Sequence, residues 1–88
     1  MKLIIAIIKD TDNDPVSHAL TSANLRVTYI ASTGGFLRHG NTTLFIGLED
    51  DRVEEALETI RSTIAPATNP EEKRAIIFVL KVDDFIHY

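Results

Sequence analysis

A run of six apolar residues near the start of the chain sets the strongest limit on its fold. Residues 3–8 read Leu-Ile-Ile-Ala-Ile-Ile, and no polar side chain interrupts them. A short run dominated by β-branched residues predicts a strand covered on both faces, as a central strand of a sheet is. Residues 75–82 form a second apolar run near the other end, with Lys81 as its one polar residue.

Two helical patterns and two strand patterns lie between these runs. An amphipathic helix follows Asp14, which has the form of an acidic cap before a proline at the first helical position, and Asn24 marks its end. A second amphipathic helix follows a capping-box pattern that starts at Asp51. Residues 25–32 and 42–48 place alternate side chains on opposite faces, as half-buried strands do.

The order of these patterns predicts an α+β fold of the ferredoxin-like βαββαβ type. Such a fold has a four-stranded antiparallel sheet with both helices on one face, and we expect one domain over residues 1–88. Two short helices leave the second face of the sheet uncovered, although the first and last strands carry apolar side chains on both faces. An apolar patch of this size predicts self-association.

Composition narrows the classes of function. A net charge of -4 argues against a broad nucleic-acid-binding face, although one or two arginines can still bind a small anion. The chain has no cysteine, its three histidines lack metal-ligand spacing, and no serine, histidine and acid set can be assembled. The first apolar run is too short to span a bilayer, and no signal-peptide cleavage pattern follows it. We therefore expect a cytoplasmic protein with no membrane span, metal, cofactor or enzymatic activity.

A glycine-rich stretch, residues 33–47, joins the two alternating strands. Phe36, a flat apolar ring, and Arg38, a fixed cation, lie between its glycines, and the Asn41 amide both donates and accepts hydrogen bonds. An aromatic face, a cation, an amide and open backbone N–H groups together suit a nucleotide. A glycine-rich turn whose ring packs on the core is the alternative interpretation.

The strand before this stretch adds two polar residues. Arg26 and Thr28 share one face and can reach the same ligand, and a solvated pair on an edge strand is the alternative. The spacing of Gly35 and Gly40 is close to that of a P-loop. Asn41 replaces the phosphate-binding lysine, however, and the stretch joins two strands, which argues against a Walker-type hydrolase.

The run Thr-Gly-Gly-Phe-Leu-Arg-His-Gly-Asn-Thr-Thr at 33–43 resembles the fingerprint of the PII-like cyclic-di-AMP receptor proteins. Nearly the whole chain shares the resemblance, including Met-Lys-Leu-Ile-Ile-Ala-Ile at the start, Asn-Leu-Arg-Val-Thr at 24–28, Asp-Asp-Arg-Val at 50–53, and Phe-Val-Leu-x-Val-Asp-x-Phe at 78–85. It implies a homotrimeric, non-enzymatic protein of the bacterial cytoplasm. Such a protein binds the second messenger cyclic-di-AMP in clefts between subunits and signals to a protein partner that the sequence does not identify.

The resemblance also implies a set of ligand-binding residues by matching position. Two on the second strand face the ligand, three in the glycine-rich stretch contact an adenine and its phosphate, and an amide bonds a base edge. A glycine leaves room for the ligand, and an aromatic residue of the last strand helps to form a wall. These residues are Arg26, Thr28, Gly35, Phe36, Leu37, Asn41, Gly47 and Phe78.

The chain departs from the family pattern in the connection between the second helix and the last strand. That connection is long, contains glycine and moves on ligand binding in the family, whereas residues 65–74 form a short one here. His39 and Lys81 also stand where a small residue and a proline are expected. Whether the short connection still permits cyclic-di-AMP binding and signalling is therefore open.

Three alternatives to cyclic-di-AMP sensing stay open. The first is a PII-like sensor of ATP, ADP or another adenine nucleotide. The second is a structural or interaction trimer with no nucleotide ligand. The third is a small ferredoxin-like hydrolase such as an acylphosphatase, although the catalytic loop pattern of that enzyme is missing.

Overall fold

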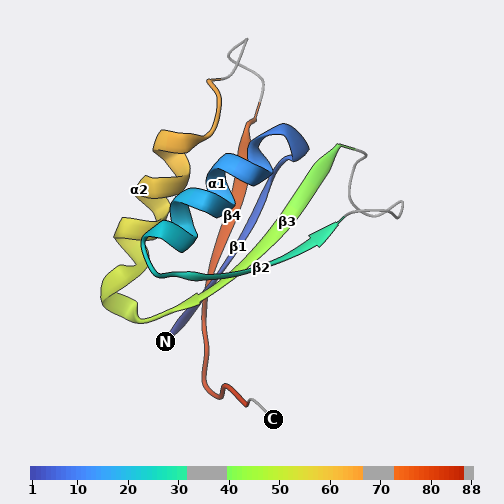
Figure 1. Ribbon diagram of the computed structural model, residues 1–88. Coiled ribbons are helices and arrows are strands. Elements are labelled where there is room, and N and C mark those ends of the chain that lie inside the picture. The colour runs from blue at the N-terminus through green and yellow to red at the C-terminus, as the bar shows by residue number, and fades with distance from the viewer. Residues whose placement is uncertain (32–39, 67–72, 87–88) are drawn as a thin grey trace.

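The computed structural model describes residues 1–31, 40–66 and 73–86 of the 88-residue chain. The predicted βαββαβ order is confirmed, and both helices lie on the same side of the sheet (Figure 1). Neither helix in these ranges is long and apolar enough to cross a membrane. The elements are β1 (Lys2–Lys9), α1 (Asp10–Ser22), β2 (Arg26–Ala31), β3 (Asn41–Leu48), the 3-10 turn η1 (Asp50–Arg52), α2 (Val53–Thr63) and β4 (Ala75–Lys81).

The four strands form one antiparallel sheet in the order β2-β3-β1-β4. This order is that of the ferredoxin-like arrangement, and β1 takes the central place that its apolar run predicts. β4 is an edge strand, with β1 as its one strand neighbour in the described part of the chain. Four of its large apolar residues are 43–51% exposed, namely Ile76, Phe78, Val79 and Leu80, whereas Ile77 packs against the core.

The hydrophobic core lies between the sheet and the two helices. The predicted alternation of β3 is confirmed, since every second side chain from Leu44 to Leu48 is buried. The apolar stripes of both helices face the same core. Its buried residues are Ile4, Ala6, Ile8, Val16, Leu20, Leu25, Leu44, Ile46, Leu48, Ala56 and Ile60.

The predicted start of the first helix is wrong. α1 begins at Asp10, four residues before the predicted cap Asp14, and Pro15 lies inside the helix. The Asp10 backbone N–H donates to the Gly40 carbonyl at 2.8 Å, and the Thr42 hydroxyl donates to the Asp10 carboxylate. These hydrogen bonds to residues 40 and 42 fix the first turn of the helix. The residues around the helix start cannot predict them, because their partners lie about 30 residues away in the sequence.

The capping box predicted at Asp51 is also wrong. Asp51 lies inside η1, and no side-chain cap hydrogen bond is present at the start of η1 or of α2. Arg52 instead donates to the Ala23 carbonyl at 2.7 Å and forms an ion pair with Glu55 at 2.7 Å. The start of α2 is therefore tied to the end of α1 by one arginine.

The end of α1 agrees with the prediction. Asn24 has a left-handed backbone with φ of +64°, and its N–H donates to the Thr21 carbonyl at 3.0 Å. The Leu25 N–H donates to the Leu20 carbonyl at 3.1 Å, which completes a Schellman motif with both leucines in the core. This motif turns the chain directly into β2.

Candidate functional site

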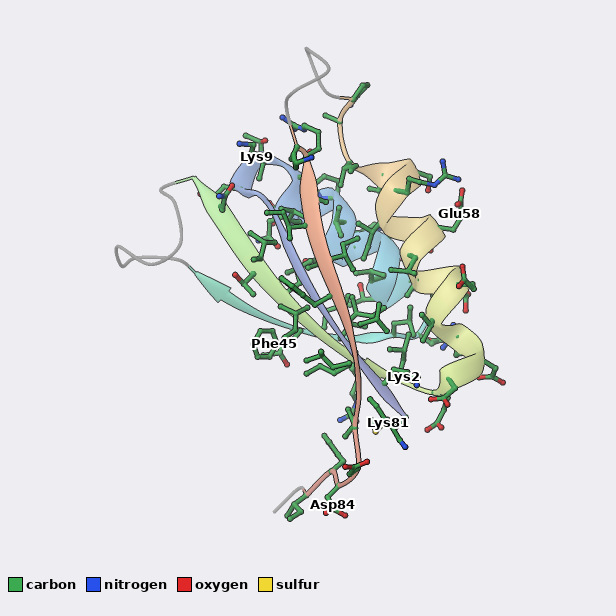
Figure 2. All side chains as sticks on the ribbon, turned by 180° about the vertical axis from the view of Figure 1, so that it is seen from behind. Lys2, Lys9, Phe45, Glu58, Lys81 and Asp84 are labelled. Carbon is green, nitrogen blue, oxygen red and sulfur yellow. The ribbon has the colours of Figure 1, made fainter. Side chains whose placement is uncertain are left out.

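In the part of the chain that the structure describes, neither helix covers the second face of the sheet (Figure 1), and this face is largely apolar. Figure 2 views the molecule from this side and labels Phe45 of β3. The strand register arranges the side chains of this face in rows that cross the sheet, and two of these rows run from an apolar residue on β4 to a polar residue on β2. These two rows are Leu80–Leu3–Gly47–Arg26 and Phe78–Ile5–Phe45–Thr28.

A cavity of about 600 Å³ opens on this face, and we call it the open-face cavity. It lies where β1 begins and β4 ends, and Figure 1 places these two points at the same end of the sheet. Small-ligand pockets have volumes of about 300–1,000 Å³, with mostly apolar walls and a few polar groups. The lining fits that description and consists of Met1, Lys2, Leu3, Arg26, Thr28, Phe45, Gly47, Val82 and Phe85.

Three residues of the predicted ligand-binding set line this cavity together. Arg26 and Gly47 are direct partners across β2 and β3, and Thr28 lies two residues along β2 from Arg26. Arg26 and Thr28 are both exposed. Among the residues that the structure describes, none forms a hydrogen bond or ion pair with the Arg26 side chain. Its guanidinium is therefore available to an anionic ligand.

The charge of the cavity differs from that of the whole chain. The protein carries 13 acidic and 9 basic side chains, yet two basic and no acidic side chains are present in the lining within the described ranges. Beside the cavity, the Met1 ammonium forms an ion pair with Asp50 at 2.9 Å. The hydrogen bond that the Asp50 carboxylate accepts from this ammonium, together with the positive charges of Met1, Lys2 and Lys81, lowers the pKa of the Asp50 carboxyl. The lining thus favours an anion in an otherwise acidic protein.

Gly47 leaves part of the cavity wall without a side chain. A Cβ placed there would lie 3.4 Å from the Met1 Cε, which is the end of a flexible side chain. Its backbone is not left-handed, so neither conformation nor packing within the free protein requires a glycine. The space beside it can therefore serve a ligand.

Two other predicted residues, Asn41 and Phe78, lie elsewhere on the sheet. Asn41 is half-buried at the start of β3 and pairs with Lys9, six residues from Gly47, which is about 20 Å along a strand. Phe78 lies beside Ile5 on the open face and is half exposed, without lining the cavity. The remaining three lie outside the described residues: Gly35, Phe36 and Leu37.

Sequence reasoning missed two aromatic residues of the lining. Phe45 shares a face with Gly47 and pairs with Thr28 across β3 and β2, so the predicted alternation of these strands held the signal for it. Phe85 follows β4 in a segment without strand or helix. Because no periodicity governs that segment, only the three-dimensional structure places this ring.

A second cavity, of about 650 Å³, lies between α2 and the edge strand β4. Its walls are apolar side chains of both elements, with acidic and basic residues in equal number around them. Of the predicted ligand-binding residues that the structure describes, none lines this second cavity. The open-face cavity is therefore the stronger candidate site.

The fold and the open-face cavity define a small α+β protein equipped to bind a compact anionic ligand. Residues 1–70 match the profile of a family described as cyclic-di-AMP receptor, and the chain belongs to this family. The match ends before β4. A solved structure of a functionally unknown protein from Pediococcus pentosaceus ATCC 25745 is also similar, with 38% identity and a TM-score of 0.79. That similarity covers 99% of this chain and 96% of the other, so it extends through β4.

Proposed function

We propose that this protein is a non-enzymatic signalling protein of the bacterial cytoplasm that binds cyclic-di-AMP at the subunit interfaces of a homotrimer. The observation that carries the proposal is the open-face cavity, in which Arg26, Thr28 and Gly47 meet beside apolar and aromatic walls. The family to which the chain belongs supports cyclic-di-AMP as the ligand.

The chemistry of the cavity matches the parts of a cyclic dinucleotide. The Arg26 guanidinium presents several N–H donors to a phosphodiester, and the Thr28 hydroxyl can donate or accept beside it. The apolar and aromatic walls suit the flat face of a base, and the gap beside Gly47 admits its edge. These groups bind and orient a ligand, and the proposed function requires no bond to be made or broken.

Two features support a site between subunits. The open face of the sheet is apolar from β1 to β4, and a second copy of the chain would bury it. Asn41 and Gly47 also lie about 20 Å apart on β3. A ligand that contacts Arg26 and Gly47 on one subunit therefore meets the Asn41 end of the strand most readily on a neighbouring subunit.

Calorimetry and light scattering test the proposal together. At micromolar concentration, light scattering should give three times the mass of the chain, and a monomer that persists would contradict the interfacial site. Cyclic-di-AMP should bind at least tenfold more tightly than cyclic-di-GMP, because a buried base edge left unpaired costs about 1–3 kcal/mol. Equal affinities would contradict recognition of adenine.

An adenine mononucleotide is the second candidate ligand. The cavity has one arginine beside aromatic walls, which also suits ATP or ADP. The same titrations decide between the two, because tighter binding of ATP than of cyclic-di-AMP would favour a general adenine-nucleotide sensor.

A further inference from the structure

A short segment after β4, residues 82–86, forms one wall of the open-face cavity. Val82 and Phe85 line the cavity, whereas the two aspartates between them do not. The Val82 N–H donates to the Met1 carbonyl at 3.1 Å, which fixes the start of the segment beside β1. The segment thus contributes apolar side chains to the lining and leaves its acidic side chains outside it.

The Phe85 side chain is 66% exposed although it lines a cavity. A large aromatic surface in this position loses contact with water when a flat ligand enters, which is favourable. Phe45 lines the same cavity from β3, and Arg26 lines it from the adjacent strand β2. One cavity therefore combines two aromatic rings with a cation.

Resting on the proposed function, we propose that Phe85, together with Phe45, forms the stacking surface for one adenine base of bound cyclic-di-AMP. Arg26 holds the phosphodiester that adjoins this base. Cyclic-di-AMP carries two bases and two phosphodiesters, so each base requires an apolar surface of its own beside a donor for phosphate. The residues of this cavity supply one such set, and the segment after β4 completes it although the family match ends at residue 70.

The neighbouring Ile86 provides a matched control for Phe85. Its side chain is 70% exposed, it is apolar, and it does not line the cavity. A general effect of apolar surface on solubility or assembly should appear at both positions. An effect on base stacking should appear at Phe85 alone.

The first test uses tryptophan as a reporter, because the chain has none of its own. Tryptophan can stack on a base as phenylalanine does, so Phe85→Trp should bind cyclic-di-AMP within about threefold of wild type, and its fluorescence should be quenched to saturation. Ile86→Trp should bind equally well with little change in fluorescence. Equal quenching at both positions, or none at Phe85→Trp while the ligand binds, would overturn the stacking surface.

The second test removes the ring and measures affinity by calorimetry. Phe85→Ala should lose roughly 5- to 150-fold in affinity for cyclic-di-AMP, which is the loss expected when an aromatic surface under a base is removed. Phe85→Leu keeps apolar bulk without a flat face and should lose most of the same affinity, whereas Ile86→Ala should bind like wild type. Light scattering and thermal melting should be unchanged in all three variants.

The outcomes separate this inference from the proposed function. If wild type binds cyclic-di-AMP and Phe85→Ala binds equally well, the stacking surface is wrong and the proposed function stands. If wild type does not bind cyclic-di-AMP, the proposed function fails and the stacking surface fails with it. If Phe85→Ala changes the mass of the assembly and binds only in proportion to the assembled fraction, Phe85 is an assembly residue and the inference is also wrong.

Discussion

The Asp12 carboxylate in α1 lies 3.0 Å from the Arg74 guanidinium just before β4, and both side chains are largely buried, at 6% and 16% exposed. The same carboxylate accepts a hydrogen bond from the Ala65 N–H at 3.3 Å. Ala65 and Arg74 are the two ends of the short connection between α2 and β4. One carboxylate in the first turn of α1 therefore holds both ends of that connection.

Asp12→Ala should destabilise the protein by about 3 kcal/mol, because it leaves a largely buried guanidinium without this carboxylate. Urea unfolding at a fixed protein concentration measures the loss, since association would otherwise shift the midpoint. Asp14→Ala is the control, because Asp14 is an exposed acidic residue of the same helix and should change stability by less than about 0.5 kcal/mol. Similar losses in the two variants would show that the ion pair contributes little.

The left-handed residue that ends α1 gives a prediction about backbone conformation. Asn24→Ala should cost about 1 kcal/mol, because alanine is strained at φ of +64°, whereas Asn24→Gly should be neutral or slightly stabilising. Asn24 is exposed, so neither change disturbs packing. Thermal melting of both variants checks this order, and an alanine variant as stable as the glycine variant would contradict the Schellman motif.

Gly47→Ala should separate folding from binding. The added methyl group would lie 3.4 Å from the Met1 Cε, so the free energy of unfolding should stay within about 0.5 kcal/mol of wild type. The methyl group enters the open-face cavity, and affinity for cyclic-di-AMP should fall about tenfold or more. Unchanged affinity in a stable variant would mean that the ligand does not approach this part of β3.

The proposed contact of Arg26 with phosphate should appear as a salt dependence. Arg26→Ala should weaken binding of cyclic-di-AMP, and its deficit should shrink as salt rises and screens the attraction in wild type. Arg26→Lys keeps the charge without the planar fork, so it should recover part of the affinity. Calorimetric titrations at low and high salt measure these differences.

Arg61→Ala is the control for the loss of a positive charge. Arg61 is exposed on α2, pairs with Glu58 and lies away from the open face. Its removal should leave binding unchanged at either salt concentration. A salt-dependent deficit of equal size at both positions would assign the effect to the overall charge of the protein.

The fold could be predicted because the spacing of apolar residues in the sequence indicates which side chains are buried. The alternation of Leu44, Ile46 and Leu48 reports which side of β3 meets the helices, whatever lies on that side. The start of α1 could not be predicted, because it depends on the hydrogen bond that the Asp10 N–H donates to Gly40 and the one that the Asp10 carboxylate accepts from Thr42. The apolar side chains on both faces of β4 indicate that both faces are buried, but they do not show which element buries them. They therefore did not reveal that β4 is an edge strand.

The candidate site was predictable only in part. Alternation placed Arg26 and Thr28 on one face, and the family resemblance added Gly47, and these three meet in one cavity. Phe85 could not be found in this way because it follows the last strand, where no repeating pattern relates a residue to the sheet. The roles assigned to residues 35–37 lie outside the described residues and stay predictions.

The central place of β1 in the sheet has a consequence for how the protein is made. β1 is synthesised before the other strands of the sheet. Its neighbours in the sheet, however, are β3 and β4, and β4 begins only at residue 75. At about 5–20 residues per second, translation takes roughly 3–13 s to proceed from residue 9 to residue 75. During that time the apolar strand β1 has at least one edge without a partner. The nascent chain is therefore most prone to aggregation or chaperone binding before β4 emerges. The four-stranded sheet can be completed only after β4 has been synthesised.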